Sequence, residues 1–199
     1  MPKFSIIIPA YNAENHIRRA LDSIACQTFK DYELIVVCDS CTDRTEEIAK
    51  QYGARTAAVE YHRDGLTRNK GIDMATGEWI LFMDDDDWWM HEFVLEQLSE
   101  KVGREGESIL CFAFIWKLYG YAAPRGNRGG HWIAVWNKCW KRSAIGSTRF
   151  SDIEKWSDVH FNTAMMSKGL KIVDWDMPLY YYNFMRPGSI SQKHNDGIE

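Results

Sequence analysis

The chain has 199 residues, of which 45% are hydrophobic and 26% are charged, and its formal net charge at pH 7 is -4. This composition is typical of one ordinary globular domain, and the acidic balance argues against a nucleic-acid-binding protein, which usually carries a basic surface. No apolar stretch is long enough to span a bilayer and the N-terminus lacks the features of a signal peptide, so we expect a cytoplasmic protein.

The first half of the chain alternates short apolar runs with segments of helical periodicity. The apolar runs are rich in β-branched residues, which favours strands buried on both faces, as in a parallel sheet. Asn12 and Thr42 or Ser40 are the expected caps of the first two helices. The expected strands are residues 4–9, 33–37, 56–61 and 79–83, and the expected helices are residues 12–28, 42–53, 65–75 and 91–102. This alternation predicts a doubly wound α/β fold whose polar strand ends share one rim.

The second half of the chain is less regular and unusually aromatic. Three tryptophans, Trp132, Trp136 and Trp140, recur at the spacing of a helix. The other expected elements are a strand at 108–119, an exposed loop at 124–130, a helix from Ser157 to about 167, and strands at 170–175 and 179–182. Polar residues from 185 onwards predict a mobile tail.

The stretch from Trp79 to Trp89 contains the strongest indication of a functional site. A buried strand leads into four consecutive carboxylates, Asp84 to Asp87. Ligands bind at the carboxyl ends of strands in open α/β sheets, and a hard divalent cation would relieve the repulsion between these side chains. The alternative is a solvated acidic turn whose last aspartate caps the next helix. This stretch alone favours the cation only slightly.

The cysteines give a weaker indication. Cys38 and Cys41 have the C-x-x-C spacing, but without a second such pair this hardly distinguishes a zinc site from a redox motif. We therefore expect all five cysteines of the chain to be free thiols.

Four segments, taken in order, resemble the inverting glycosyltransferases of family 2, which have the GT-A fold. They are FSIIIPAYN at 4–12, ELIVVCDSCTD at 33–43, RNKG at 68–71 with DDDD at 84–87, and WNK at 136–138 with the residues that follow to 182. The resemblance is to a compact bacterial-type member. It implies a single α/β domain with a mixed, mostly parallel sheet flanked by helices. The domain would span residues 1–185, with a nucleotide-binding half at 1–102, an acceptor half at 103–185 and a polar, mobile tail at 186–199.

The chain departs from the family pattern at three places. Cys38 stands where the pattern has the first of two aspartates, and Ser40 and Cys41 replace a glycine and a serine. Ser157 replaces the glutamate of a Glu-Asp pair. The stretch between the acidic turn and Trp136 is short for the family.

The resemblance assigns a role to each candidate site residue. Asp158 is the expected general base, and a helix N-terminus favours its ionised form. The expected nucleotide-sugar contacts are Pro9, Ala10 and Tyr11 as a wall for uracil, Asp39 for the uracil imide, Arg68 for the base or phosphates, and Asp84 and Asp85 for the rest of the donor. The expected ligands of Mn²⁺ or Mg²⁺ are Asp86 and, in support, Asp87. The alternatives are that Asp39 only organises a turn, that Arg68 is a surface charge, and that Asp158 or Ser157 only caps a helix.

The implied function is a metal-dependent transfer of a sugar from a UDP donor to a hydroxyl of a saccharide or lipid-linked acceptor, in cell-surface polysaccharide synthesis. A lipid-linked acceptor would bring the protein to the inner face of the membrane. One alternative is a nucleotidyltransferase that makes nucleotide sugars, although residues 9–12 are not the Gly-rich basic loop it should carry. The other is a non-catalytic relative that binds nucleotide sugars, which the substitutions at Cys38 and Ser157 keep open.

Overall fold

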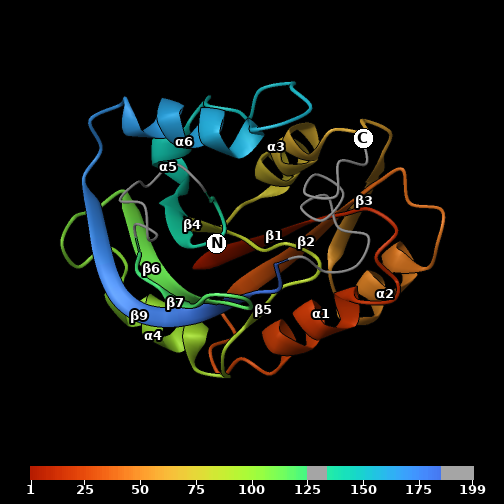
Figure 1. The fold of residues 1–199 in the computed structure, drawn as a ribbon, viewed down its shortest axis with the longest axis horizontal. Coiled ribbons are helices and arrows are strands. Elements are labelled where there is room, and N and C mark those ends of the chain that lie inside the picture. The colour runs from red at the N-terminus through yellow and green to blue at the C-terminus, as the bar shows by residue number, and fades with distance from the viewer. Residues whose placement is uncertain (125–133, 185–199) are drawn as a thin grey trace.

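The computed structural model describes residues 1–124 and 134–184, and one mixed sheet runs through that part of the chain (Figure 1). The strands are β1 (Phe4–Ala10), β2 (Tyr32–Asp39), β3 (Arg55–Val59), β4 (Trp79–Phe82), β5 (Trp88–Trp89), β6 (Ile109–Trp116), β7 (Gly120–Ala122), β8 (Lys138–Lys141) and β9 (Ile172–Tyr182). The helices are α1 (Ile17–Ala25), α2 (Thr45–Gln51), α3 (Asp64–Met74), α4 (Val94–Lys101), α5 (Arg142–Ile145) and α6 (Ser157–Met166). Strand order is β3-β2-β1-β4-β8-β6-β9-β5, and β7 pairs with β6.

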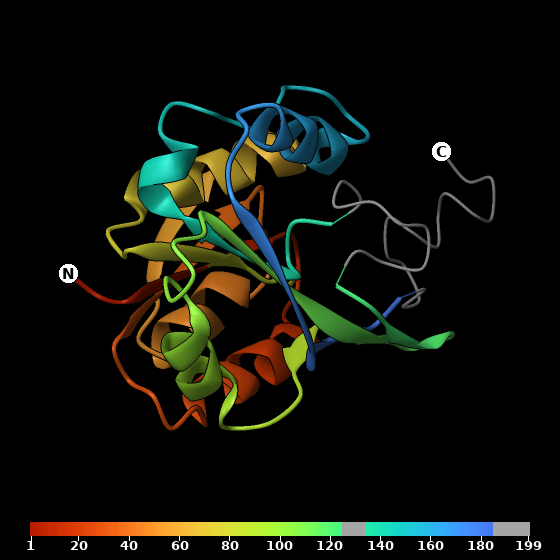
Figure 2. The same cartoon turned by 90° about the vertical axis from the view of Figure 1, so that its left-hand side faces the viewer.

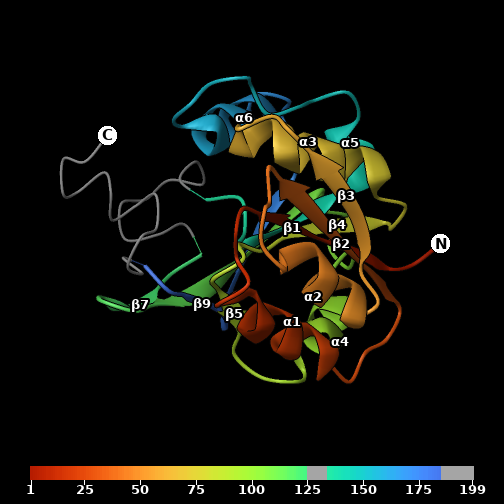
Figure 3. The ribbon, with the colours of Figure 1, turned by 90° about the vertical axis from the view of Figure 1, so that its right-hand side faces the viewer.

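The first half forms the parallel block that the sequence predicts. β1 lies between β2 and β4 and runs parallel to both, and β3 continues the block beyond β2. Helices α1, α2 and α4 cover one face of the sheet, and α3, α5 and α6 cover the other (Figure 1, Figure 3). The central residues of β1 are fully buried. The expected α/β fold, a mixed sheet with helices on both faces, is confirmed.

The second half extends the sheet with antiparallel and irregular pairs. β8 runs antiparallel to both β4 and β6, and β9 runs parallel to β6 (Figure 2). The two strands expected at 170–175 and 179–182 are one strand, β9, whose register with β6 shifts on either side of Ala113. Pro178 pairs with Ala113 and has no N–H to donate to the neighbouring strand. The proline therefore interrupts the regular pairing locally, and β9 continues beyond it.

The expected helix through the tryptophans is wrong where the structure describes them. Trp140 belongs to strand β8, and Trp136 lies in the turn before it. A separation of four residues puts two side chains on one face of a strand as well as on one face of a helix, so this spacing does not distinguish the two. Trp132 lies outside the described residues, as do the exposed loop from 125 onwards and the expected tail at 186–199.

The expected helix caps are also wrong. α1 starts at Ile17 and not at Asn12, whose backbone has a φ of 45° and whose side chain accepts the N–H of Thr42 at 2.8 Å. α2 starts at Thr45, whose N–H donates to the Asp43 carboxylate at 3.0 Å. Asn12 therefore joins the loops after β1 and β2.

Among the described residues, no helix combines the length and apolar character that crossing a bilayer requires.

Helix α3 packs directly on β1 through Gly71. A Cβ at this position would lie 2.3 Å from Cγ2 of Ile7, which is fully buried. We expect Gly71→Ala to lower the free energy of unfolding by about 1–3 kcal/mol through overpacking, although alanine is the better helix former by about 1 kcal/mol. Denaturant unfolding measures the change.

The Ile7→Ala background is the control for this prediction. Removing Cγ2 creates the space that the new methyl group needs, so Gly71→Ala should cost much less there. An equal cost in both backgrounds would contradict the proposed contact.

Glu33 joins β2 to the segment that leads into β4. Its carboxylate accepts hydrogen bonds from the Ser5 hydroxyl at 2.7 Å, from the Thr76 N–H at 2.6 Å and from Arg55 at 2.6 Å. Burial alone would raise the pKa of Glu33, but these hydrogen bonds outweigh it and lower the pKa to about 2 from an ordinary value of 4.5. Glu33 thus fixes the position of the segment that leads into β4, the strand that precedes the acidic turn.

A lowered carboxyl pKa makes this stabilisation depend on pH. It is present above pH 4.5 and is lost as the pH falls towards 2. We expect Glu33→Gln to lower the free energy of unfolding at pH 7 by about 3 kcal/mol, and the difference from wild type to shrink as the pH falls. The exposed Glu100→Gln serves as the control. A difference that stays constant down to pH 2 would contradict this role of Glu33.

Candidate active site

The candidate site lies at the rim where parallel strands end. Because β1 runs parallel to β2 and β4, the residues that follow these strands gather there. α6 packs beside α3 over one face of the sheet and begins near this rim (Figure 1). The structure therefore brings together the wall at 9–11, Asp39, the acidic turn at 84–87 and Asp158.

The four carboxylates of the acidic turn have different partners. The N–H of Asp87 donates to the carbonyl of Asp84 at 3.2 Å, which closes the turn. Asp85 accepts the N–H of Tyr11 at 3.4 Å and pairs with the ring Nε2 of His16 at 3.1 Å. These contacts fix the turn against the loop after β1. Asp86 is half-buried.

Asp87 is fully buried and anchors the turn to the end of β9. Its Oδ2 accepts the Tyr180 hydroxyl at 2.7 Å, and its Oδ1 accepts the N–H of Asn183 at 2.8 Å. The Tyr180 hydroxyl also accepts the N–H of Asp84 at 3.1 Å. Burial, followed by the charges of Asp84 and Asp86, raises the pKa of Asp87 well above its usual range. Asp87 neither caps a helix nor exposes an oxygen to a cation.

Arg68 is the cation of the site and is not a surface charge. Its side chain is 4% exposed and forms ion pairs with Asp64, with Asp84 at 2.7 Å and with Asp158 at 3.6 Å. Burial would lower the pKa of Arg68, but the attraction of Asp158 and Asp84 outweighs it and raises the pKa. The guanidinium thus connects α3, the acidic turn and α6.

Asp84 has the most crowded carboxyl group at the rim. Burial raises its pKa to about 7; the attraction of Arg68 opposes this rise, and repulsion from Asp158, Asp86 and Asp85 adds to it. The side chain is nevertheless 28% exposed. Asp84 can therefore gain either a proton or a neighbouring cation at neutral pH.

Asp158 lies in the first turn of α6 and is 24% exposed. Its Oδ1 is inaccessible and faces Arg68 without a hydrogen bond to any described residue, so the exposure belongs to the rest of the side chain. The alternative that Ser157 or Asp158 caps the helix is wrong, because α6 has no side-chain cap and both residues lie inside its first turn.

Asp39 is 6% exposed, and both its oxygens already accept hydrogen bonds. The donors are the N–H groups of Tyr61, His62 and Arg63 and the hydroxyls of Ser40 and Thr67. Burial would raise the pKa of Asp39, but these hydrogen bonds lower it. This geometry supports the turn-organising interpretation: Asp39 holds the segment between β3 and α3, and an incoming base would meet a carboxylate that already has partners.

The end of β1 offers one exposed ring. Ala10 is buried and Pro9 is half-buried, whereas Tyr11 is 63% exposed. The Tyr11 ring is therefore free to contact a ligand, while the other two residues contribute backbone.

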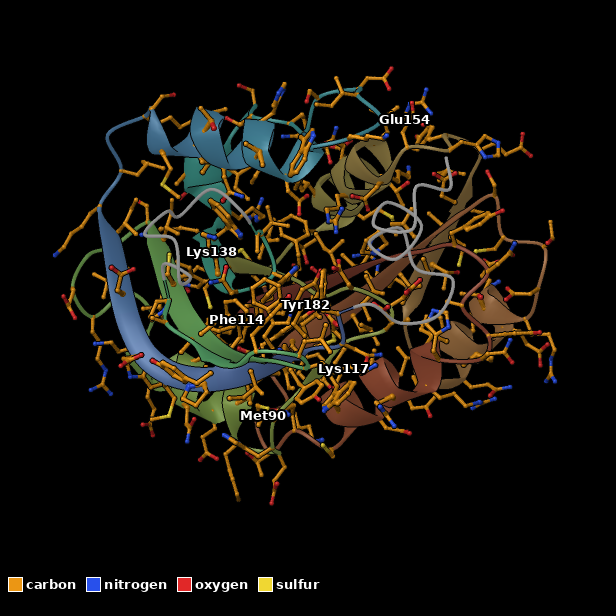
Figure 4. All side chains as sticks on the ribbon, in the orientation of Figure 1. Met90, Phe114, Lys117, Lys138, Glu154 and Tyr182 are labelled. Carbon is orange, nitrogen blue, oxygen red and sulfur yellow. The ribbon has the colours of Figure 1, made fainter. Side chains whose placement is uncertain are left out.

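Lys138 is a buried amine between β8 and α6. It donates to the carbonyl of Ala134, which also accepts the Asn162 side chain, and to the side chain of Asn137 at 2.9 Å. Burial lowers the pKa of Lys138 to about 8, although the charges of nearby acidic groups, among them Asp158, act against this. Figure 4 shows Lys138 in the interior of the molecule. Lys138 is therefore an interior group and not a surface contact.

Sequence reasoning missed several partners of these residues. Tyr180 and Asn183 lie more than ninety residues from Asp87, and no local pattern links them. His16 and Asp85 are likewise distant in sequence. Asp64, in contrast, stands four residues before Arg68, and this spacing on a helix predicts an ion pair.

The donor atoms at the rim fit a hard cation only in part. Within residues 1–124 and 134–184, no three side chains of His, Cys, Asp or Glu form a cluster that could hold a metal ion. A cation held at Asp86 would therefore take its remaining ligands from a substrate and from water, as Mg²⁺ commonly does. All-oxygen ligation at the turn suits Mg²⁺ or Mn²⁺.

Comparisons with known sequences agree with this geometry. Residues 5–171 match the family model described as Glycosyl transferase family 2. Glycosyltransferase GlyA of Streptococcus pneumoniae serotype 4 is 28% identical over 221 residues, which cover 96% of this chain and 32% of GlyA. Putative glycosyltransferase EpsH of Bacillus subtilis is 28% identical over 229 residues, 97% of this chain and 64% of EpsH. The chain thus spans less than two-thirds of either relative.

Solved structures show the same fold. S. aureus TarS in complex with UDP superposes with a TM-score of 0.77 at 21% identity, over 90% of this chain and 60% of that one. Mannosyltransferase PcManGT from Pyrobaculum calidifontis, in complex with GDP-Man and Mn²⁺, has a TM-score of 0.76 at 18% identity, over 94% and 58%. These likenesses establish the architecture. The chain is a member of glycosyl transferase family 2 with a GT-A fold.

Proposed function

We propose that this chain transfers a sugar from a nucleotide donor, UDP-linked, to a hydroxyl group of a saccharide or lipid-linked acceptor, with inversion, during synthesis of a cell-surface polysaccharide. The observation that carries the proposal is Arg68, which pairs with both Asp84 of the acidic turn and Asp158 of α6. One guanidinium thereby holds the proposed donor end and the proposed base together. TarS, with the same fold, binds UDP and UDP-GlcNAc, which supports a UDP donor.

The donor half of this proposal uses the rim between β1 and β4. The exposed Tyr11 ring offers a face to a nucleobase, and Asp39 holds the adjoining segment at 61–63 in place. Asp84 and Asp85 lie between this wall and Arg68, where a ribose and diphosphate would reach them. A divalent cation at Asp86 would neutralise charge on the departing diphosphate. Asp87 stabilises the acidic turn through the hydrogen bond that it accepts from the Tyr180 hydroxyl.

The acceptor half uses Asp158. Its accessible oxygen would take the proton of the attacking hydroxyl while the oxygen forms a bond to the anomeric carbon and the bond to the diphosphate breaks. Attack opposite the leaving group inverts the configuration at that carbon, through a transition state of oxocarbenium character. Arg68 holds the other oxygen of Asp158 and so fixes the direction of the carboxylate.

Donor binding tests the role of the acidic turn. We expect wild-type protein to bind UDP by calorimetry with Mn²⁺, and binding to fall at least about tenfold with EDTA or in Asp86→Ala, because the diphosphate loses its counter-charge. Asp31→Ala, an exposed aspartate at the opposite end of β2, is the matched control and should bind like wild type. Tight binding that ignores the metal would show that the turn is only structural.

Turnover tests the role of Asp158. We expect Asp158→Asn to lower the rate of sugar transfer about 10²–10⁴-fold while donor affinity stays close to wild type, because the base acts on the acceptor. Asp152→Asn, which changes an aspartate that precedes α6 and is 67% exposed, should keep full activity. If Asp158→Asn retains activity, another group is the base. Donor binding without turnover in wild type would favour the non-catalytic alternative.

A further inference from the structure

Two cysteines lie together at the carboxyl end of β2. Cys38 is the partner of Ala10 in the parallel register of β1 and β2, and it is 1% exposed. Cys41 follows three residues later and is half-buried. Between them Ser40 adopts a φ of 55°, the left-handed conformation that folds the chain back after a strand. The C-x-x-C spacing thus becomes a pair of neighbouring thiols.

Both thiols make specific contacts. The thiols of Cys38 and Cys41 lie close enough for each to shift the pKa of the other. The Cys41 thiol donates a hydrogen bond to the carbonyl oxygen of Ala10 at 3.4 Å. The sulfur of Cys41 is therefore held between the ends of β1 and β2.

These contacts make the two thiols chemically unequal. The contact with Cys38 is the largest of the causes that lower the pKa of Cys41, and the same contact, followed by burial, raises the pKa of Cys38. A thiolate is the nucleophile in thiol–disulfide exchange. Cys41 is half-buried whereas Cys38 is only 1% exposed, so Cys41 is the attacking thiol and Cys38 is the buried resolving thiol beside it.

Cys41 is also the thiol that a reagent can reach. Both cysteines line a cavity of about 330 Å³ between the ends of β2 and β3 and the start of α2. Three carboxylates line the same cavity, those of Asp43, Glu46 and Glu60. A neutral or cationic molecule fits this lining better than an anion does.

We propose that Cys38 and Cys41 form a thiol–disulfide exchange site for small neutral or cationic disulfides. The Cys41 thiolate attacks one sulfur of the small disulfide, so a Cys41 mixed disulfide forms and one small thiolate leaves. The Cys38 thiol then loses its proton and attacks the Cys41 sulfur, which releases the second small thiol. The protein loses two hydrogens in all, and the small disulfide becomes two thiols. Capping of Cys41 in the first step removes its charge, which assists ionisation of Cys38 in the second.

Mass spectrometry tests the exchange on the whole chain. Folded protein is treated with cystamine, with hydroxyethyl disulfide or with glutathione disulfide, quenched in acid, alkylated and cleaved with trypsin. The peptide Asp31–Arg44 contains both cysteines and no other. We expect it to be unalkylated and two hydrogens lighter than the free dithiol, to return to the dithiol with reductant, and to form fastest with cationic cystamine and slowest with anionic glutathione disulfide.

Two variants fix the order of the steps. Cys38→Ser should stop at a mixed disulfide on Cys41, and Cys41→Ser should leave Cys38 unmodified, because Cys38 is buried. Cys26→Ser removes a solitary exposed thiol and should change nothing. The proposal is overturned if wild-type protein keeps both thiols alkylatable with every reagent, or if its Cys41 mixed disulfide persists unresolved. The wild-type result decides even where circular dichroism shows that a variant does not fold.

An effect on donor binding follows, and this part rests on the proposed function. The disulfide removes the Cys41 S–H donor from Ala10, next to the proposed base wall. Oxidised protein should bind UDP several-fold more weakly than reduced protein, and equal affinities would overturn this effect. If neither form binds UDP although the disulfide forms, the donor assignment fails and the exchange site stands.

Discussion

The buried guanidinium of Arg68 is the constraint on which the arrangement of the site depends. A charge that is 4% exposed is stable only when it is paired, and its partners come from three separate segments of the chain. Asp64 belongs to the same helix, Asp84 to the acidic turn and Asp158 to α6. Because one guanidinium pairs with carboxylates of both the acidic turn and α6, the packing of α6 against α3 and the position of the turn are linked. The spacing between the acidic turn and Asp158, the proposed donor end and the proposed base, is therefore set before any substrate arrives.

The acidic turn shows how one residue type takes several roles within four positions. The turn is closed by a backbone hydrogen bond, so successive side chains leave it in different directions. Asp84 faces Arg68, Asp85 faces the loop after β1, and Asp87 points inward to Tyr180. The burial of each carboxylate and its hydrogen-bond partners determine whether it supports the turn or can face a ligand. A run of four aspartates in the sequence therefore identifies the site without assigning its members.

Local pattern was enough to predict the sheet and its rim, because apolar β-branched runs determine buried strands and parallel strands end at one edge. It was not enough for features set by distant contacts. Asn12 matches a helix cap, yet its side chain joins Thr42 in another loop. Trp136 and Trp140 have a spacing that suits either a helix or a strand, and pairing with β4 and β6 decides between them. Asp87 differs from its neighbours because it is fully buried and bonded to Tyr180 and Asn183, which are distant in sequence.

The charges at the rim are unbalanced, and this imbalance bears on the proposed chemistry. Arg68 is shared by three carboxylates, and Asp85 and Asp86 add negative charge nearby. Burial raises the pKa of Asp84 to about 7, and repulsion from Asp158, Asp86 and Asp85 adds to this rise. A nucleotide diphosphate is itself strongly anionic. It would meet net repulsion at such a rim, since one guanidinium cannot offset both the protein carboxylates and the phosphates. A divalent cation that arrives with the donor would make the net electrostatic interaction between the rim and the diphosphate attractive. The charge balance of this chain's own residues thus supports the proposed metal dependence of the transfer reaction.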